Sequence, residues 1–124
     1  MTTSTRTLTL GSMLLGSTNA PALREWYRTT FAPDHEGDGP IELGGFHLVI
    51  DERDDVSHTN GEPGRVILNF HVDDIDEVAA RLDAAAVTWR TPVEDRGFAK
   101  IGTFLDPDGN YLQLVQFAEG NEPA

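Results

Sequence analysis

A repeated unit in the sequence constrains the fold of this chain more than any other feature. Residues 12–27 and 67–82 align without a gap, and each reads as a strand, a two-residue turn and an amphipathic helix. Asn19 falls on Asp74 in this alignment, so a residue suited to begin a helix stands at the same place twice. Internal repetition of this kind predicts an architecture built from two like units.

Capping residues and apolar spacing locate the two helices. Asn19 offers an N-cap and Pro21 is tolerated in a first helical turn, so the first helix begins there, and Pro33 ends it. Asp74 stands three residues before Glu77, an arrangement that resembles a capping box. The second helix then carries an apolar stripe formed by Ile75, Val78, Ala79, Leu82 and Ala86.

A tight β-hairpin is predicted near the C-terminus, around the sequence Asp106-Pro107-Asp108-Gly109. Proline presets φ for the second turn position, the aspartates can accept hydrogen bonds from nearby backbone amides, and glycine can take a positive φ. The arm after the turn alternates, with one set of side chains on each face. Tyr111, Gln113 and Val115 share one face, and Leu112, Leu114 and Gln116 share the other.

Further strands and a polar linker complete each half. We predict strands at residues 7–15, 41–50, 66–72 and 87–90, and a polar loop at 91–97. Each half then reads βαβββ, with module one at residues 7–52, a loop at 53–64 and module two at 65–118. We therefore predict an α+β fold in a single domain that spans residues 1–124.

Composition narrows the classes of partner. The net charge is −12, and the 9 basic residues are scattered along the chain, so we expect no nucleic-acid partner. The absence of cysteine excludes disulfides, thiolate nucleophiles and Cys-ligated metal sites. No apolar run reaches membrane-spanning length, and residues 1–9 lack the hydrophobic core of a signal peptide. We accordingly expect no membrane partner and a cytoplasmic location.

Three segments carry a family likeness: Leu23-Arg24-Glu25-Trp26-Tyr27, His71-Val72-Asp73-Asp74-Ile75-Asp76-Glu77-Val78, and Thr103-Phe104-Leu105-Asp106-Pro107-Asp108-Gly109-Asn110-Tyr111-Leu112-Gln113-Leu114. Together they resemble the vicinal oxygen chelate superfamily, which includes glyoxalase I, extradiol dioxygenases, bleomycin- and fosfomycin-resistance proteins and methylmalonyl-CoA epimerase. The resemblance implies paired βαβββ modules whose curled mixed sheets surround a shared cavity, often within a homodimer.

Metal-using members of this superfamily take one ligand from the first strand and one from the last strand of each module. The resemblance places these positions at Ser12, Ile67 and Gln113, and at either His47 or Val49. Isoleucine cannot bind a metal, a neutral serine is a poor ligand, and a glutamine amide is weaker than the glutamate of metal enzymes. We therefore expect no metal and no other cofactor, with a divalent metal as the alternative.

The favoured function is the binding of a small organic molecule, an antibiotic or a metabolite, in the cavity. The residues expected to line it are Ser12, Leu14, His47, Ile67, Asn69, His71, Tyr111 and Gln113. His71 is either a ligand-binding group and candidate acid or base, or a structural histidine at the end of a strand. One alternative is a metal-dependent or His71-dependent lyase, isomerase or dioxygenase of the glyoxalase kind. The other is a dimeric domain without a ligand of its own.

Overall fold

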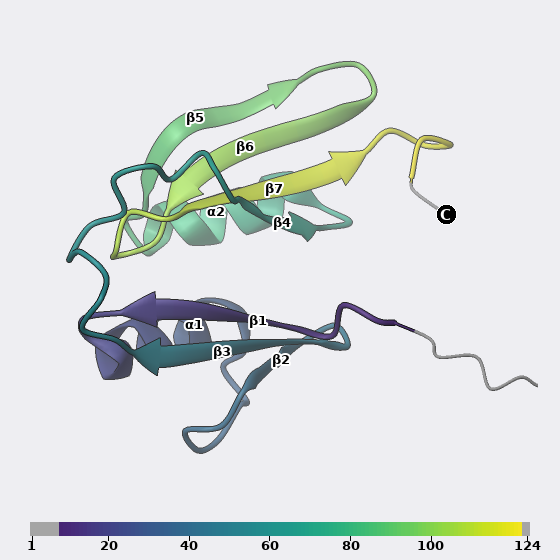
Figure 1. Ribbon diagram of the computed structural model, residues 1–124. Coiled ribbons are helices and arrows are strands. Elements are labelled where there is room, and N and C mark those ends of the chain that lie inside the picture. Colours follow the sequence, from purple (N-terminus) through teal and green to yellow (C-terminus); the bar gives the residue numbers. More distant parts are fainter. Residues whose placement is uncertain (1–7, 123–124) are drawn as a thin grey trace, which may run out of the picture.

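The computed structural model describes residues 8–122, which form two modules joined by a linker (Figure 1). Module one contains β1 (Ser12–Ser17), α1 (Ala20–Phe31), β2 (Ile41–Leu43) and β3 (Phe46–Glu52). Module two contains β4 (Leu68–His71), α2 (Ile75–Ala84), β5 (Thr88–Asp95), β6 (Ala99–Leu105) and β7 (Tyr111–Phe117). The predicted α+β class is confirmed. Neither helix is long and apolar enough to cross a membrane.

The two sheets share one topology, except that module one has one strand fewer. Strand order is β1-β3-β2 in the first sheet and β4-β7-β6-β5 in the second. In each module the strand that comes first in the chain pairs in parallel with the strand that comes last, β1 with β3 and β4 with β7. Module one lacks a counterpart of β5, where the repeat led us to expect a strand. Residues 32–40 stand in its place, and their two prolines and two glycines disfavour a strand.

The predicted helix caps are confirmed. Asn19 Oδ1 accepts a hydrogen bond from Ala22 N at 3.4 Å, and Asp74 Oδ1 accepts one from Glu77 N at 3.2 Å. A second pair of caps was missed. Glu52 Oε1 accepts from Ala20 N at 2.9 Å, and Gln116 Oε1 accepts from Ile75 N at 2.8 Å. The end of each last strand therefore satisfies the first amide of its own module's helix, which has no partner within the helix.

The predicted hairpin turn is confirmed, and it is held by one carboxylate. Gly109 has a φ of +83°, the conformation that favours glycine. The side chain of Asp106 accepts hydrogen bonds from Asp108 N at 2.9 Å and from Asn110 N at 3.0 Å. It also accepts one from the buried hydroxyl of Tyr27 in α1, at 2.6 Å. The turn thus joins module two to the helix of module one.

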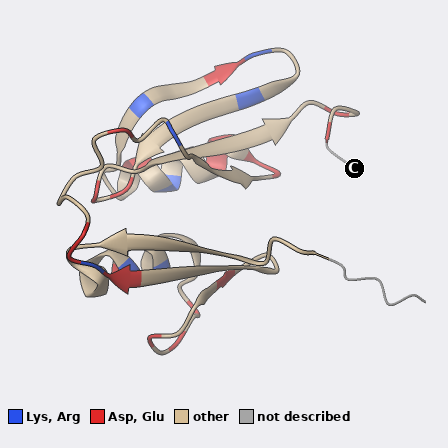
Figure 2. Cartoon of the chain, viewed as in Figure 1, with Lys and Arg blue, Asp and Glu red and all other residues tan. Residues whose placement is uncertain are grey.

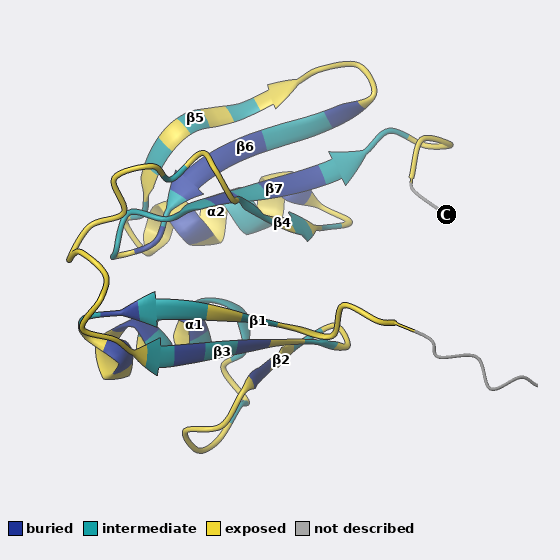
Figure 3. Cartoon of the chain, viewed as in Figure 1, coloured by how far each residue is buried: buried dark blue, intermediate teal, exposed yellow. Residues whose placement is uncertain are grey.

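One apolar core serves both modules (Figure 3). Leu112 and Leu114, which the alternation placed on one face of β7, are both fully buried in this core. Phe31 at the end of α1 stacks on Phe70 of β4, with ring centroids 4.2 Å apart and an interplanar angle of 9°. Because these contacts cross from one module to the other, neither module closes its core alone.

The linker between β3 and β4 is fastened to both modules. Asn60 N donates to Asp108 O at 2.9 Å, and Asn60 Nδ2 donates to Asn110 Oδ1 at 2.8 Å. Two residues before Asn60, His58 Nδ1 lies 2.8 Å from Thr18 Oγ1 of module one. The linker begins with charged residues of both signs (Figure 2), where Arg53 forms an ion pair with Asp55. These ties gather at the same end of the molecule as the β6–β7 turn (Figure 1).

Strand β5 differs from its prediction. The sequence indicated a short strand at 87–90 and a polar loop at 91–97, but the strand continues to Asp95. Its pairing with β6 shifts register twice, between Trp89 and Thr91 and between Thr91 and Glu94. β5 is an edge strand, so Pro92 can stand in it without removing a ladder hydrogen bond from the sheet's interior.

Candidate functional site

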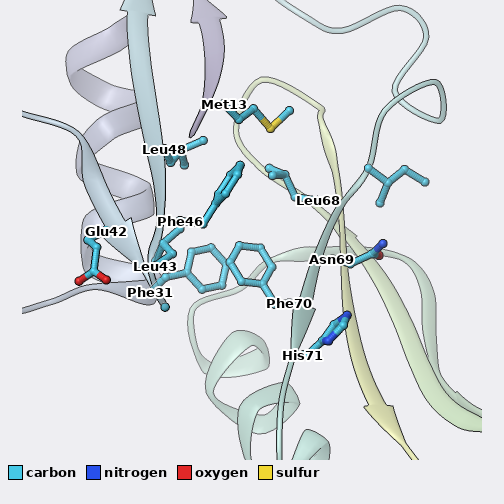
Figure 4. Close-up of a pocket in the computed structure, with 12 residues that line it drawn as sticks. Met13, Phe31, Glu42, Leu43, Phe46, Leu48, Leu68, Asn69, Phe70 and His71 are labelled. Carbon is cyan, nitrogen blue, oxygen red and sulfur yellow. The ribbon is translucent and has the colours of Figure 1, made fainter. Parts of the chain in front are cut away.

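A cavity of about 670 Å³ lies where the two modules meet (Figure 4). Eight of the twelve residues that line it have apolar side chains, and three of these are phenylalanines. A site of this size, with a predominantly apolar lining and few polar groups, is typical of small-molecule pockets. Module one contributes Met13, Phe31, Glu42, Leu43, Gly44, Phe46 and Leu48, and module two contributes Ile67, Leu68, Asn69, Phe70 and His71.

Three of the eight sequence-predicted residues line this cavity, namely Ile67, Asn69 and His71. They lie on or beside β4, the edge strand of the second sheet, and the cavity lining includes residues from both faces of this strand. The side chain of Asn69 points away from the aromatic cluster, whereas Phe70 belongs to it (Figure 4). The side chain of His71 contacts Phe117 edge-on, with ring centroids 5.1 Å apart.

The other five predicted residues lie on the sheet faces turned away from the helices. Ser12 and His47 are register partners in β1 and β3, and both are exposed, as is Leu14. On β7, Tyr111 and Gln113 are half-buried, and Gln113 Nε2 donates to Thr103 Oγ1 at 3.0 Å. The cavity therefore does not include these five residues.

Sequence reasoning missed the apolar wall of the cavity. Met13, Phe46 and Leu48 alternate along β1 and β3 with the residues that were expected to line it, so the alternation placed them on the opposite face. They do face the helix side of the first sheet, but that side continues past α1 to the module junction. The signal in the sequence was the proline- and glycine-bearing segment 32–40, which replaces a counterpart of β5, because a sheet one strand short leaves part of its apolar face uncovered.

The strand register decides which residue of module one corresponds to Gln113. Gln113 pairs with Asn69 in β7 and β4, and Leu14, which the repeat places on Asn69, pairs with Val49. Val49, not His47, is therefore the counterpart of Gln113.

The four positions inferred from the resemblance are thus Ser12, Val49, Ile67 and Gln113. Two hydrocarbons, an alcohol and an amide do not fit the donor set of a divalent metal. Within residues 8–122, no three His, Asp or Glu side chains are grouped so that they could hold a metal ion.

Beside the cavity, one buried polar pair joins the modules. Burial, and secondly the negative charge of Asp106, raise the pKa of Tyr27 well above its ordinary value. The phenol therefore remains a neutral donor to the Asp106 carboxylate at physiological pH. Its position within the core gives it a structural role that supports Phe31, one turn further along α1.

Comparison with known proteins agrees with this architecture. A crystal structure of a glyoxalase/bleomycin resistance protein/dioxygenase from Nocardioides superposes with a TM-score of 0.74 at 17% identity, over 98% of this chain and 91% of that chain. TnmS3, an antibiotic binding protein from Streptomyces sp. CB03234, superposes with a TM-score of 0.70 at 21% identity, over 92% and 99% of the two chains.

A glyoxylase/bleomycin resistance protein/dioxygenase domain from Frankia sp. EAN1pec gives a TM-score of 0.70 at 22% identity, over 94% of this chain and 96% of that chain. No curated protein matches the sequence. At these identities the structural matches show the fold alone. The family model of the Glyoxalase/Bleomycin resistance protein/Dioxygenase superfamily, in contrast, matches residues 9–114 of the sequence itself. This chain therefore belongs to the glyoxalase/bleomycin resistance protein/dioxygenase superfamily.

Proposed function

We propose that this protein binds a small organic molecule in the cavity between its modules and holds it by apolar and hydrogen-bond contacts, without a metal. The observation that carries the proposal is the cavity itself, which has an aromatic and aliphatic wall and a polar edge at Asn69 and His71. Apolar area removed from water supplies about 25 cal/mol per Å², so such a wall favours a ligand with an apolar body. The amide and the imidazole offer hydrogen bonds that orient it.

The comparisons support this choice of function. TnmS3, which shares the fold, is described as an antibiotic binding protein. We extend that activity to this chain as a proposal, with an antibiotic or a metabolite of similar size as the ligand.

The donor chemistry at the family's ligand positions favours binding over metal-dependent lysis, isomerisation or dioxygenation. Val49 and Ile67 cannot bind a cation, and Gln113 already donates to Thr103. A metal enzyme on this fold would need a different set of ligands from those that the resemblance indicates.

The proposal predicts that a neutral, apolar dye binds in the cavity and that filling the cavity displaces it. Leu43→Trp places an indole in the wall, and we expect it to weaken the binding of Nile red about tenfold or more. Leu8→Trp is the matched control, because Leu8 is 93% exposed and does not line the cavity. Fluorescence titration measures both dissociation constants, with circular dichroism to verify folding.

Two results would contradict the proposal. One is a folded wild-type protein that does not bind Nile red, or binds it equally well after Leu43→Trp. The other is a stoichiometric divalent metal in protein purified without chelator, measured by inductively coupled plasma mass spectrometry. That result would overturn the proposal that binding needs no metal.

A further inference from the structure

The linker that joins β3 to β4 (Figure 1) carries a chemically reactive dipeptide, Asn60-Gly61. Asn60 is the only asparagine in the sequence that glycine follows. The backbone nitrogen of the next residue can attack the side-chain carbonyl carbon of an asparagine, and glycine hinders this attack least because it has no Cβ. Both residues are exposed, and a Cβ at Gly61 would meet no atom within 4 Å. Packing therefore does not shield the dipeptide from water.

The hydrogen bonds around the dipeptide leave the attacking nitrogen free and polarise its target. In the described part of the chain, the backbone nitrogen of Gly61 donates to no protein acceptor, whereas that of Gly109 in the β6–β7 turn donates to Asp106 O at 3.0 Å. Asn60 Oδ1 accepts a hydrogen bond from Glu62 N at 2.9 Å. This N–H stabilises negative charge on Oδ1, which is where charge develops when the side-chain carbonyl is attacked.

We propose that Asn60 is a site of spontaneous deamidation in the folded protein. The nitrogen of Gly61 forms a bond to Cγ of Asn60, the bond from Cγ to Nδ2 breaks, and ammonia leaves with the proton of the Gly61 amide. Water then opens the resulting cyclic imide at either of its carbonyl carbons. Opening at Cγ yields aspartate. Opening at the backbone carbonyl carbon yields isoaspartate, in which the main chain runs through Cβ and Cγ.

The modification acts on a residue that fastens the linker to the β6–β7 turn. Asn60 Nδ2 donates to Asn110 Oδ1 at 2.8 Å, and Asn110 Nδ2 in turn donates to Asp106 Oδ2 at 2.8 Å. An aspartate in place of Asn60 has no side-chain donor, and Asn110 cannot reverse its own amide without giving up the bond to Asp106. The new charge also joins a small cavity that Asp55 and Asp108 already line. Deamidation therefore loosens the tie between the linker and module two.

Peptide mapping by mass spectrometry tests the proposal on protein kept folded at mildly alkaline pH, with circular dichroism to verify folding. We expect aspartate and isoaspartate to accumulate at Asn60, while Asn69 and Asn110, which no glycine follows, stay intact. Gly61→Ala adds a Cβ that meets no neighbour, so the variant should fold normally and react about tenfold more slowly. The folded chain should react at least as fast as chain unfolded in guanidinium chloride, because only the fold holds the Glu62 amide against Oδ1.

Asn60→Asp reproduces one product directly and should raise the equilibrium constant for unfolding in urea about fivefold. Asn121→Asp changes the net charge equally at an exposed residue, so it should change this constant less than about twofold. The inference is overturned if the folded protein forms no product at Asn60, if only unfolded chain reacts, or if Gly61→Ala reacts as fast as wild-type protein. Equal stability of Asn60→Asp and Asn121→Asp would overturn the assigned consequence.

Discussion

The hydroxyl of Tyr27 is the polar group through which α1 reaches the second module. It is fully buried and donates to Asp106, whose carboxylate also accepts three hydrogen bonds from the turn that follows it. A buried carboxylate needs such donors, because an ion without partners is costly in a low-dielectric interior. The tyrosine thus supplies one of the donors that this buried carboxylate needs, from an element of the other module.

Removing this hydroxyl should therefore destabilise the fold. We expect Tyr27→Phe to lower the free energy of unfolding by about 1.5–3 kcal/mol, the range for a hydrogen bond to a charged group. Urea denaturation measures the change, with Tyr111→Phe as the control for loss of a phenol from a half-buried side chain. Equal losses in both variants would contradict the role assigned to Tyr27.

The same residue makes stability depend on pH in the alkaline range. The folded state raises the pKa of Tyr27 above its unfolded value of 10.0, chiefly by burial, so the unfolded chain releases its proton first. Its contribution is complete below pH 10 and is lost as pH rises above that value. Unfolding measured from pH 8 to 11 should show a decline that is smaller in Tyr27→Phe than in wild-type protein.

The helices show which elements of the fold a sequence pattern can reveal. The caps at Asn19 and Asp74 were predictable because each side chain bonds an amide three residues away. The caps from Glu52 and Gln116 were not, since they join residues 32 and 41 positions apart. For the same reason the full length of β5 was missed, because its pairing with β6 outweighs the local signals of Pro92 and its charged neighbours.

The equivalence of Glu52 and Gln116 leads to a prediction for α1. A neutral amide performs this task in module two, so Glu52→Gln should keep the cap and change the free energy of unfolding by less than about 0.5 kcal/mol. Glu52→Ala leaves the amide of Ala20 without its partner and should cost about 1 kcal/mol or more. Thermal and urea unfolding distinguish the two variants. If Glu52→Gln is as damaging as Glu52→Ala, charge rather than hydrogen bonding holds the end of this helix.

For the whole molecule, the candidate site was only partly predictable from sequence. Alternation along a strand identifies two faces, but it does not say which face borders a cavity. Ile67, Asn69 and His71 border the cavity as expected, and so do Leu68 and Phe70 from the opposite face of the same strand. The apolar wall around Phe46 and Leu48 depends on how the two modules meet, which is a property of tertiary packing alone.

The shared core predicts that both modules unfold together. Trp26 lies in α1 of module one and Trp89 in β5 of module two, so each module carries its own fluorescent reporter. We expect the single-tryptophan variants Trp26→Phe and Trp89→Phe each to give one urea transition by fluorescence that coincides with the loss of circular dichroism. A fluorescence transition that is displaced from the circular dichroism of the same variant would show that the modules unfold separately.

Because the described strands form two separate sheets, no backbone ladder crosses the junction between β1 and β4. The polar ties between the modules gather at one end, at the Asp106 turn and the linker, whereas the cavity is lined by Met13 and Phe46, near the starts of β1 and β3, which lie toward the other end (Figure 1). This arrangement has the mechanics of a hinge. We therefore expect any relative motion of the modules to exchange side-chain contacts at the cavity and to leave the hydrogen bonds of the Asp106 turn and the linker intact.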